Sequence, residues 1–253
     1  GGPGSSPVIF GNTLIVHRDG ADQQYVAALD LRTGSIRWKR PRSAPLRETD
    51  HTHRAFSTPL LHEHDGRTLL ISPGADQCHA YDAATGEELW HVRFVGFSTV
   101  PRPVAEGEFV YFCTGYFTPQ LVAVRLGGKG DVTKSHVAWS YKAQIPDVPS
   151  PILVDGRIYI VSNKGVLTCL DAVTGERAFV HRLGGNYYAS PLYAGGRLYF
   201  CSREGITRVV SIDNPPDVIA TNKLDDAIFA SPVAVDGELY LRTEKHLYKI
   251  QER

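Results

Sequence analysis

Short apolar runs bounded by turn residues recur along the whole chain. Arg157–Val161 reads Arg-Ile-Tyr-Ile-Val, Arg197–Cys201 reads Arg-Leu-Tyr-Phe-Cys, and Glu238–Arg242 reads Glu-Leu-Tyr-Leu-Arg. The runs scarcely alternate between apolar and polar residues, a pattern that predicts strands buried on both faces of their sheets. Each run follows a turn that contains glycine, so the chain is predicted to be all-β and built from hairpins.

A Ser-Pro phrase, or a close variant of it, divides the chain into six repeats. Its prolines recur at intervals of 40 to 52 residues, at Pro7, Pro59, Pro103, Pro151, Pro191 and Pro232. A period of this length with several short strands in each unit is typical of β-propeller blades. We therefore predict a single β-propeller domain over residues 1–253 with four-stranded antiparallel blades, at about 5–56, 57–101, 102–149, 150–189, 190–230 and 231–253. A β-sandwich of regular hairpins is the alternative, but it would not require the repeated phrase.

A second phrase, Asp-x-x-Thr-Gly, marks three of the repeats. It spans residues Asp30–Gly34, Asp82–Gly86 and Asp171–Gly175. An aromatic residue follows eight positions after each Asp, at Trp38, Trp90 and Phe179. The Asp can accept hydrogen bonds from the turn amides while the Gly takes a positive φ, which predicts a tight turn between the third and fourth strands. The aromatic ring, like that of Trp139 in the third repeat, is then predicted to lie on the fourth strand and to pack on a neighbouring blade.

These residues resemble the quinoprotein-type, or PQQ-like, propeller repeat, whose blade signature is Ala-x-Asp-x-x-Thr-Gly-x-x-x-Trp with the Trp docked on an adjacent blade. The likeness is specific in two blades and looser elsewhere, since Arg125 takes the Asp place in the third blade and no aromatic follows Asp213 in the fifth. Within this family the chain is most similar to noncatalytic proteins related to the outer-membrane assembly factor BamB. The resemblance implies a scaffold for protein partners in the periplasm or another extracytoplasmic compartment.

The two ends of the chain bear on the number of blades. Residues 1–5 contain nothing strand-like, and the sixth repeat stops after its third predicted strand. A propeller normally completes its last blade with a strand from the opposite terminus. Family members commonly have eight blades, and we expect this chain to be part of an eight-bladed parent; a six-unit ring with a three-stranded closing blade is the alternative. The chain begins at Gly1 and has no Met, which is consistent with removal of an upstream signal or anchor.

Charge and cysteine content narrow the classes of function. Lys and Arg number 27 and Asp and Glu also number 27, so no basic field exists to attract nucleic acid or anionic membranes. No apolar run reaches the length of a membrane span. The four cysteines, Cys78, Cys113, Cys169 and Cys201, show neither a CxxC pair nor a dense disulfide pattern. They are predicted to be buried free thiols.

One face of the predicted propeller is the candidate surface for protein partners. Loops between the second and third strands of a blade, and loops from the fourth strand to the next blade, are expected to lie on that face. Segment 40–56 is its longest loop and carries four arginines and two histidines. Interleaved arginines and aromatics are typical of protein interfaces. The predicted partner-binding residues are Arg18, Asp19, Arg47, His51, His53, Arg54, Arg102, Tyr116, Phe117, Tyr187 and Arg203; solvated turns or packed blade edges are the competing interpretation.

Metal sites and phosphate loops are not predicted. His51 and His53 have the residue type of zinc ligands, but the cluster at 62–65 is expected in a turn between the first and second strands, on the opposite face. The two clusters should therefore not converge on one ion. The glycines around Lys129 are predicted to form a loose turn without a helix behind it, so they do not predict a phosphate site.

The sequence also favours a binding scaffold over an enzyme. The resemblance implies that catalytic relatives stack pyrroloquinoline quinone near the propeller axis with calcium and a disulfide between adjacent cysteines. Here the tryptophans fall on outer strands, adjacent cysteines are absent, and no hydrolase motif occurs. We predict no cofactor and no catalysis. A quinone-dependent dehydrogenase, or a propeller that binds a sugar or another small ligand in its axial channel, is the alternative.

Overall fold

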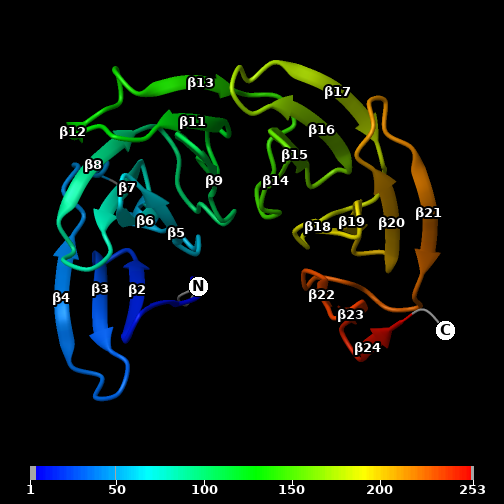
Figure 1. Ribbon diagram of the computed structural model, residues 1–253, viewed down its shortest axis with the longest axis horizontal. Helices are drawn as coiled ribbons and strands as arrows, with labels where there is room; N and C mark the ends of the chain where they lie inside the picture. Colours follow the sequence, from blue (N-terminus) through cyan, green and yellow to red (C-terminus); the bar gives the residue numbers. More distant parts are fainter. Residues whose placement is uncertain (1–3, 49, 252–253) are drawn as a thin grey trace. The chain divides into compact units, whose positions relative to one another are not determined.

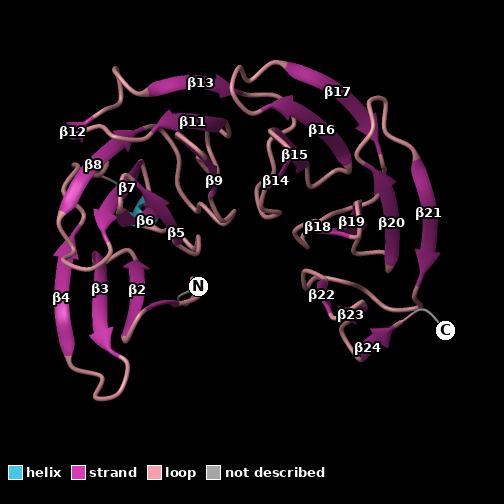
Figure 2. Cartoon of the chain, viewed as in Figure 1, coloured by secondary structure: helices cyan, strands magenta, loops and turns pink. Residues whose placement is uncertain are grey.

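The computed structural model describes residues 4–48 and 50–251, and the side chains of Asp50 and His51 lie outside that description. Strands supply almost all of the regular structure (Figure 2), and the one helical segment in these ranges is a short 3-10 turn, η1, at Asp50–His53. Across the same ranges, no helix combines the length and the apolar character that a membrane crossing requires. The chain divides between Ala143 and Gln144 into two compact units.

The first unit contains three sheets whose strands mostly follow one another along the chain (Figure 1). The first sheet consists of β1 (Val8–Phe10), β2 (Thr13–Asp19), β3 (Gln24–Asp30) and β4 (Ile36–Pro41). The second is built on β5 (Leu60–His64), β6 (Arg67–Pro73), β7 (Gln77–Asp82) and β8 (Glu88–Arg93). The third consists of β9 (Val104–Glu106), β10 (Phe109–Cys113), β11 (Leu121–Arg125) and β13 (Val137–Tyr141).

The glycine-rich insert of the third repeat is not the loose turn that its composition predicts. Its strand β12 (Gly130–Asp131) pairs in parallel with β8, so that Gly130 lies opposite Trp90 and Asp131 opposite His91. The next residue, Val132, is buried in the core between the second and third sheets. Burial of Val132 and of Leu126, together with the hydrogen bond from the Val132 N–H to the backbone oxygen of His91 at 2.9 Å, fixes the insert to the neighbouring sheet, which composition alone does not indicate.

The second unit contains three further antiparallel sheets. The first consists of β14 (Ile152–Val154), β15 (Arg157–Val161), β16 (Val166–Asp171) and β17 (Arg177–Arg182). The second consists of β18 (Leu192–Ala194), β19 (Arg197–Cys201), β20 (Ile206–Ser211) and β21 (Val218–Lys223). The third has three strands, β22 (Val233–Val235), β23 (Glu238–Arg242) and β24 (Leu247–Ile250).

The Asp-x-x-Thr-Gly turns have the predicted geometry. Asp30 Oδ1 accepts hydrogen bonds from the backbone N–H groups of Arg32 and Thr33 at 3.1 and 2.9 Å. Asp82 and Asp171 make the same pair of bonds in their own turns. The closing glycines of the three turns, Gly34, Gly86 and Gly175, have φ of 72°, 70° and 73°. Each turn therefore reverses the chain between the third and fourth strands of its sheet, as predicted.

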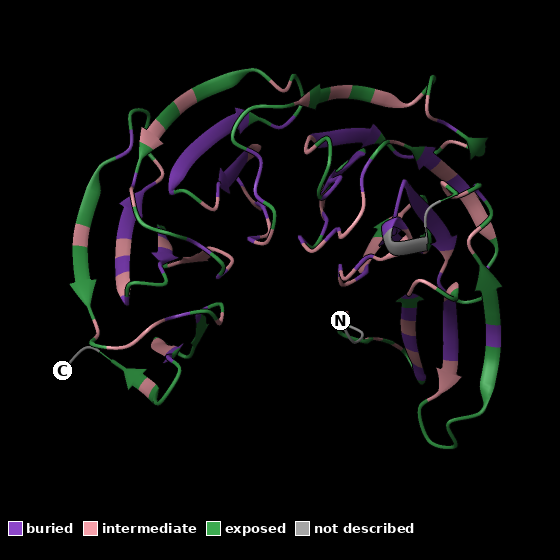
Figure 3. Cartoon of the chain, turned by 180° about the vertical axis from the view of Figure 1, so that it is seen from behind, coloured by how far each residue is buried: buried purple, intermediate pink, exposed green. Residues whose placement is uncertain are grey.

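Packing between sheets explains the continuous apolar runs. All five residues of β10 are buried, as are most residues of β7 and β16, whereas the outer strands β4, β17 and β21 are largely exposed (Figure 3). Apolar clusters join the first sheet to the second, the second to the third, and the fourth to the fifth. All four cysteines are buried and free, as predicted. Four-stranded antiparallel sheets packed face to face are the blades of a β-propeller, which confirms the predicted fold class.

Candidate functional site

Two kinds of loop lie together at the same end of the sheets within each unit. In the first unit, Phe97 follows the fourth strand of one blade and Tyr116 lies between the second and third strands of the next. Their backbones form an isolated antiparallel bridge, with N–H···O distances of 3.2 and 2.8 Å. In the second unit, Ile228 and Thr243 form a bridge between the same two kinds of loop. The geometry of the loops therefore places several predicted partner-binding residues side by side.

The first aromatic cluster consists of Arg47, Phe97, Tyr116 and Phe117. The guanidinium carbon of Arg47 lies 5.5 Å from the ring centroid of Phe97 and 5.5 Å from that of Phe117. The rings of Phe97 and Tyr116 meet edge to face at 5.5 Å. Tyr116 and Phe117 remain 62% and 64% exposed, so a cation–π assembly on one side presents two open rings on the other.

The loops that carry this cluster are held tightly. A Cβ added to Gly96 would lie 2.1 Å from the backbone oxygen of Thr114, and one added to Gly115 would lie 2.4 Å from that of Phe97. Only residues without a side chain allow the two loops to approach this closely. Asp76 strengthens the arrangement, because its carboxylate accepts hydrogen bonds from the Gly96 N–H at 2.9 Å and from Arg47 Nε at 2.7 Å.

The second unit carries an equivalent arrangement, the second aromatic cluster, made of Tyr188, Arg203 and Phe229. The guanidinium carbon of Arg203 lies 5.2 Å from the Tyr188 ring and 4.9 Å from the Phe229 ring. The two rings meet edge to face at 5.9 Å and are 38% and 39% exposed. Each unit thus presents one arginine between partly exposed aromatic rings, residue types that are enriched in protein interfaces.

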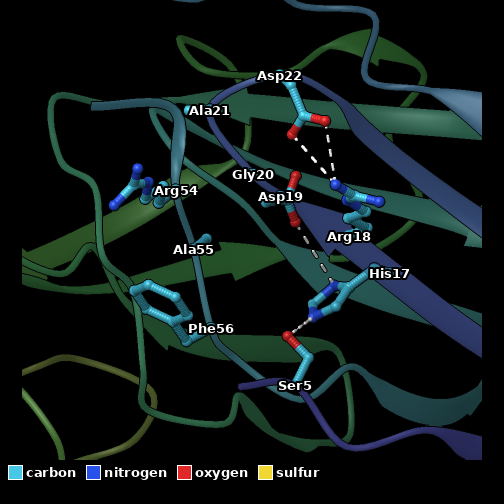
Figure 4. Close-up of a pocket in the computed structure, with 10 residues that line it drawn as sticks. All are labelled: Ser5, His17, Arg18, Asp19, Gly20, Ala21, Asp22, Arg54, Ala55 and Phe56. Carbon is cyan, nitrogen blue, oxygen red and sulfur yellow. Dashed lines mark hydrogen bonds and ion pairs between the residues drawn. The ribbon is translucent and has the colours of Figure 1, made fainter. Parts of the chain in front are cut away.

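A polar pocket of about 280 Å³ lies beside the end of β2 in the first unit (Figure 4). Arg18 and Asp22 form an exposed ion pair at 3.1 Å on one side of it, and Arg54 and Phe56 line the opposite side. Exposed pairs of this kind contribute little to stability, since water screens them. Their side chains are therefore available for contact with another molecule.

His17 forms the buried floor of this pocket. Its Nδ1 accepts a hydrogen bond from Ser72 Oγ at 2.8 Å, and its Nε2 donates to the backbone oxygen of Ser57. Burial lowers the pKa of His17 to about 4, against a smaller opposing effect of Asp19. The imidazole is therefore neutral at physiological pH and serves as a structural link between loops.

Several predicted partner-binding residues do not have the exposed side chains that the prediction requires. Asp19 is buried, because Arg42 forms a two-point ion pair with it at 2.9 and 2.7 Å. Tyr187 is also buried, and its hydroxyl accepts a hydrogen bond from Arg208 at 2.9 Å. The sequence did not distinguish Arg42 from its neighbouring arginines, although it is the one that the fold buries.

The remaining predicted residues fall into three groups. Arg18, Arg102 and Arg203 are exposed, and Arg47, His53 and Arg54 are half-buried. The ring of His53 donates a hydrogen bond to the backbone oxygen of Arg47, which stabilises the loop. The side chain of His51 lies outside the described part of the chain. The surface is therefore smaller and more aromatic than the arginine-rich loop suggested.

The histidines of the 51–53 and 62–65 clusters that the structure describes do not belong to the one group of possible metal ligands found in its described ranges. His62 to His64 belong to strand β5, with the turn at Asp65 and Gly66 instead, and His62 contacts the backbone of Gly107. Within the described ranges, one group of three residues has its ligand atoms within 4.8 Å of one another, namely His79, Glu88 and His91. No sequence motif marks this group, because the three residues meet only through strand pairing.

Repeated four-stranded antiparallel blades, with aromatic and arginine residues clustered on their loops, define the class: a β-propeller. The profile of the family described as outer membrane protein assembly factor BamB matches residues 22–150 and 131–216. The chain belongs to this family.

Solved structures support the fold. The crystal structure of BamB from Moraxella catarrhalis is similar to this chain with a TM-score of 0.68 and 17% sequence identity, over 96% of this chain and 70% of that one. At this identity the likeness bears on the fold alone. A comparison with curated proteins found no match.

Proposed function

We propose that this propeller is a noncatalytic scaffold that binds protein partners during outer-membrane protein assembly, in the periplasm or at the outer membrane. Membership of the BamB family supports the compartment and the process. The two aromatic clusters support the mode of binding, because exposed aromatic rings held beside arginine are typical interface anchors.

The conformation of Phe117 carries this proposal. Its φ is 93°, a value that a residue with a side chain adopts at a cost of about 1–3 kcal/mol. Phe117 is nevertheless 64% exposed, so its contacts within the chain, chiefly with Arg47, offset only part of that cost. A partner that covers the ring supplies the missing stabilisation, and the tightly packed loop presents the ring without further loss of conformational entropy.

Arg47 adds a polar anchor to the apolar one. Its Nε is bonded to Asp76, but its Nη2 is buried and has no hydrogen-bond partner among the described residues. An unpaired guanidinium N–H group costs free energy, and because the Arg47 side chain as a whole is 31% exposed, it can turn this group toward an acceptor on a partner and recover that cost. We therefore propose that the partner contributes an aromatic or aliphatic side chain against Phe117 and a carbonyl or carboxylate toward Arg47.

The proposal is tested by capture of outer-membrane assembly proteins from solubilised envelopes of the native organism. The baits are the wild-type chain, the double variant Tyr116→Ser with Phe117→Ser, and the control Leu31→Ser, which removes another exposed apolar residue of the first unit. Quantitative mass spectrometry should show at least a tenfold loss of captured assembly proteins for the double variant and none for the control. Equal capture by all three baits contradicts the proposal.

A further inference from the structure

Strand pairing places three metal-binding side chains on one face of the second blade. His79 on β7 lies directly opposite His91 on β8. Glu88 and His91 are three residues apart and would point to opposite faces of a regular strand. The register shifts between Ala80 and Tyr81, and this β-bulge turns the Glu88 carboxylate toward the two imidazoles. Glu88 Oε1 lies 2.8 Å from His91 Nδ1 and 3.4 Å from His79 Nδ1.

The hydrogen bonds of Gln77 determine which nitrogen of His79 has a free lone pair. Gln77 Nε2 donates to the backbone oxygen of Ala44 at 3.3 Å, so its Oε1 points to His79. Oε1 can only accept, and it lies 2.6 Å from His79 Nε2, which therefore carries the proton. His79 Nδ1 then holds a lone pair, and it is fully buried without a hydrogen-bond partner among the described residues.

An unprotonated nitrogen and a carboxylate oxygen therefore face the same point. Both are acceptors, so neither can satisfy the other. Glu88 Oε1 already accepts a hydrogen bond from Ser43 Oγ at 2.8 Å, whereas His79 Nδ1 has no donor among the described residues, and a buried acceptor without a partner is destabilising. A cation between them resolves the conflict. We propose that His79, Glu88 and His91 bind one divalent transition-metal ion of the zinc class through two imidazole nitrogens and one carboxylate oxygen.

Two of the three distances between ligand atoms are close to those that such an ion needs, and all three ligand atoms lie within 4.8 Å of one another. Zinc binds imidazole nitrogen and carboxylate oxygen at about 2.0–2.2 Å, so neighbouring ligand atoms of a tetrahedral site lie about 3.3 Å apart. The 3.4 Å between His79 Nδ1 and Glu88 Oε1 already matches this separation. His91 Nδ1 needs to move outward by about half an ångström from its hydrogen bond with Glu88. The Nδ1 proton leaves to solvent as the ion takes its place and solvent returns a proton to Nε2, so that the bound imidazole stays neutral.

One imidazole has an outer hydrogen-bond partner, and a carboxylate lies near the other. Metal-bound histidines usually donate their second ring N–H to a carbonyl or a carboxylate. His79 Nε2 donates to the amide oxygen of Gln77, and His91 Nε2 lies 3.9 Å from Asp131 Oδ2. Asp131 reaches this place because β12 pairs with β8 at His91. The insert of the third repeat thus brings a carboxylate to the second blade.

The combination is confined to one of the five blades with a fourth strand. The strand pairing and the bulge recur in the others, but the positions equivalent to His79, Glu88 and His91 hold other residues. In chain order these are Ala27, Ile36 and Lys39; Val122, Val137 and Ser140; Thr168, Arg177 and Val180; and Arg208, Val218 and Thr221. The repeat architecture alone therefore does not account for the three ligands.

An ion can reach the site from solvent, and the nearby buried charge does not prevent it from binding. The side chain of His79 is fully buried, whereas those of His91 and Glu88 are 15% and 23% exposed, so one side of the site reaches solvent. The buried cation nearby, Arg42, is paired with Asp19 at 2.7 Å, which offsets its repulsion of an incoming ion. A fourth ligand position remains for water.

Calorimetric titration of the untagged, chelator-stripped full chain with zinc chloride tests the site, and cobalt(II) reports its geometry through the visible bands of a four-coordinate ion. We expect one ion per chain with a dissociation constant on the order of micromolar or tighter. Glu88→Gln and His91→Ala should each weaken binding about 100-fold, and Asp131→Asn about tenfold. The control His181→Ala, a histidine of β17 in the other unit, should leave it unchanged.

Circular dichroism and the melting temperature establish that each variant is folded before titration. Absence of saturable zinc binding by the wild-type chain would overturn the proposal. So would binding that survives Glu88→Gln and His91→Ala, or binding that His181→Ala weakens to the same extent. Because the metal and the partner surface are measured separately, failure here leaves the scaffold proposal standing.

Discussion

Trp38 of the first blade lies against Gly86 in the turn of the second blade. A Cβ added to Gly86 would come within 2.5 Å of Trp38 Cδ2, and Gly86 itself has a φ of 70°. Arg40 reinforces the contact by donating a hydrogen bond to the backbone oxygen of Gly86 at 3.0 Å. One glycine thus serves both the reversal of its own strand pair and the docking of the preceding blade.

Substitution of Gly86 separates these two roles. Gly34 has a φ of 72° but nothing within 4 Å of an added Cβ, so it is a matched control. We expect Gly34→Ala to lower the free energy of unfolding by about 1–2 kcal/mol, through backbone strain alone. Gly86→Ala should lower the free energy of unfolding by about 1–3 kcal/mol more than Gly34→Ala does, because the added methyl group displaces the Trp38 ring. Urea unfolding measures both, and equal losses would mean that the ring does not rest on this turn.

Trp90 should be the most important aromatic residue at a blade junction. Its side chain is 1% exposed and packs in the cluster that contains Leu126 and Val132 of the next blade. Trp90→Ala is expected to lower the free energy of unfolding by about 3–5 kcal/mol. Trp139 is only half-buried, so Trp139→Ala should lower the free energy of unfolding by less. A loss below about 1 kcal/mol for Trp90→Ala would place its ring in solvent.

Acid should destabilise the fold through His17. Burial lowers the pKa of His17 from 6.5 to about 4, so the unfolded chain binds the proton more tightly than the folded one. The contribution of neutral His17 is therefore fully present above pH 6.5, declines as the pH falls, and is lost by about pH 4. The decline should amount to about 3 kcal/mol. The free energy of unfolding of His17→Gln should not show this decline between pH 6.5 and pH 4. Parallel plots of unfolding free energy against pH for the wild type and the variant would refute the role given to His17.

The ion pair of Asp19 and Arg42 should show strong coupling. Both side chains are almost fully buried, at 1% and 2% exposure, so removal of one leaves the other charged and unpaired. Asp19→Asn and Arg42→Met should each lower the free energy of unfolding by about 3–5 kcal/mol, and the double variant should lower it by less than the sum of the two losses. Additive losses in a double-mutant cycle would show that the pair is screened by water.

Local signals predicted the fold well. The Asp-x-x-Thr-Gly turns and the Ser-Pro phrase identified the blades, because turn chemistry depends on neighbouring residues and the period of the repeat follows from the blade. The pairing of β12 with β8 was missed, since it depends on a parallel contact between different blades. That all six blades form a single domain stays a prediction.

The candidate site was predicted only in part. The loop positions of Arg47, Tyr116 and Phe117 were found from blade order, but their contact with Phe97 depends on how two loops pack. Asp19 was assigned to the surface because a charged residue near a turn is usually exposed, whereas a buried arginine holds it here. His79 and Glu88 carried no sequence motif, since a β-bulge and cross-strand pairing bring them together.

The most direct test of the scaffold function is site-specific photo-cross-linking in cells of the native organism. A photoreactive amino acid at position 117 reports contacts of the first aromatic cluster, and the same residue at position 31 reports another exposed apolar position in that unit. We predict covalent adducts with an outer-membrane assembly protein from position 117 and none from position 31. Adducts from both positions alike, or from neither, would contradict the account.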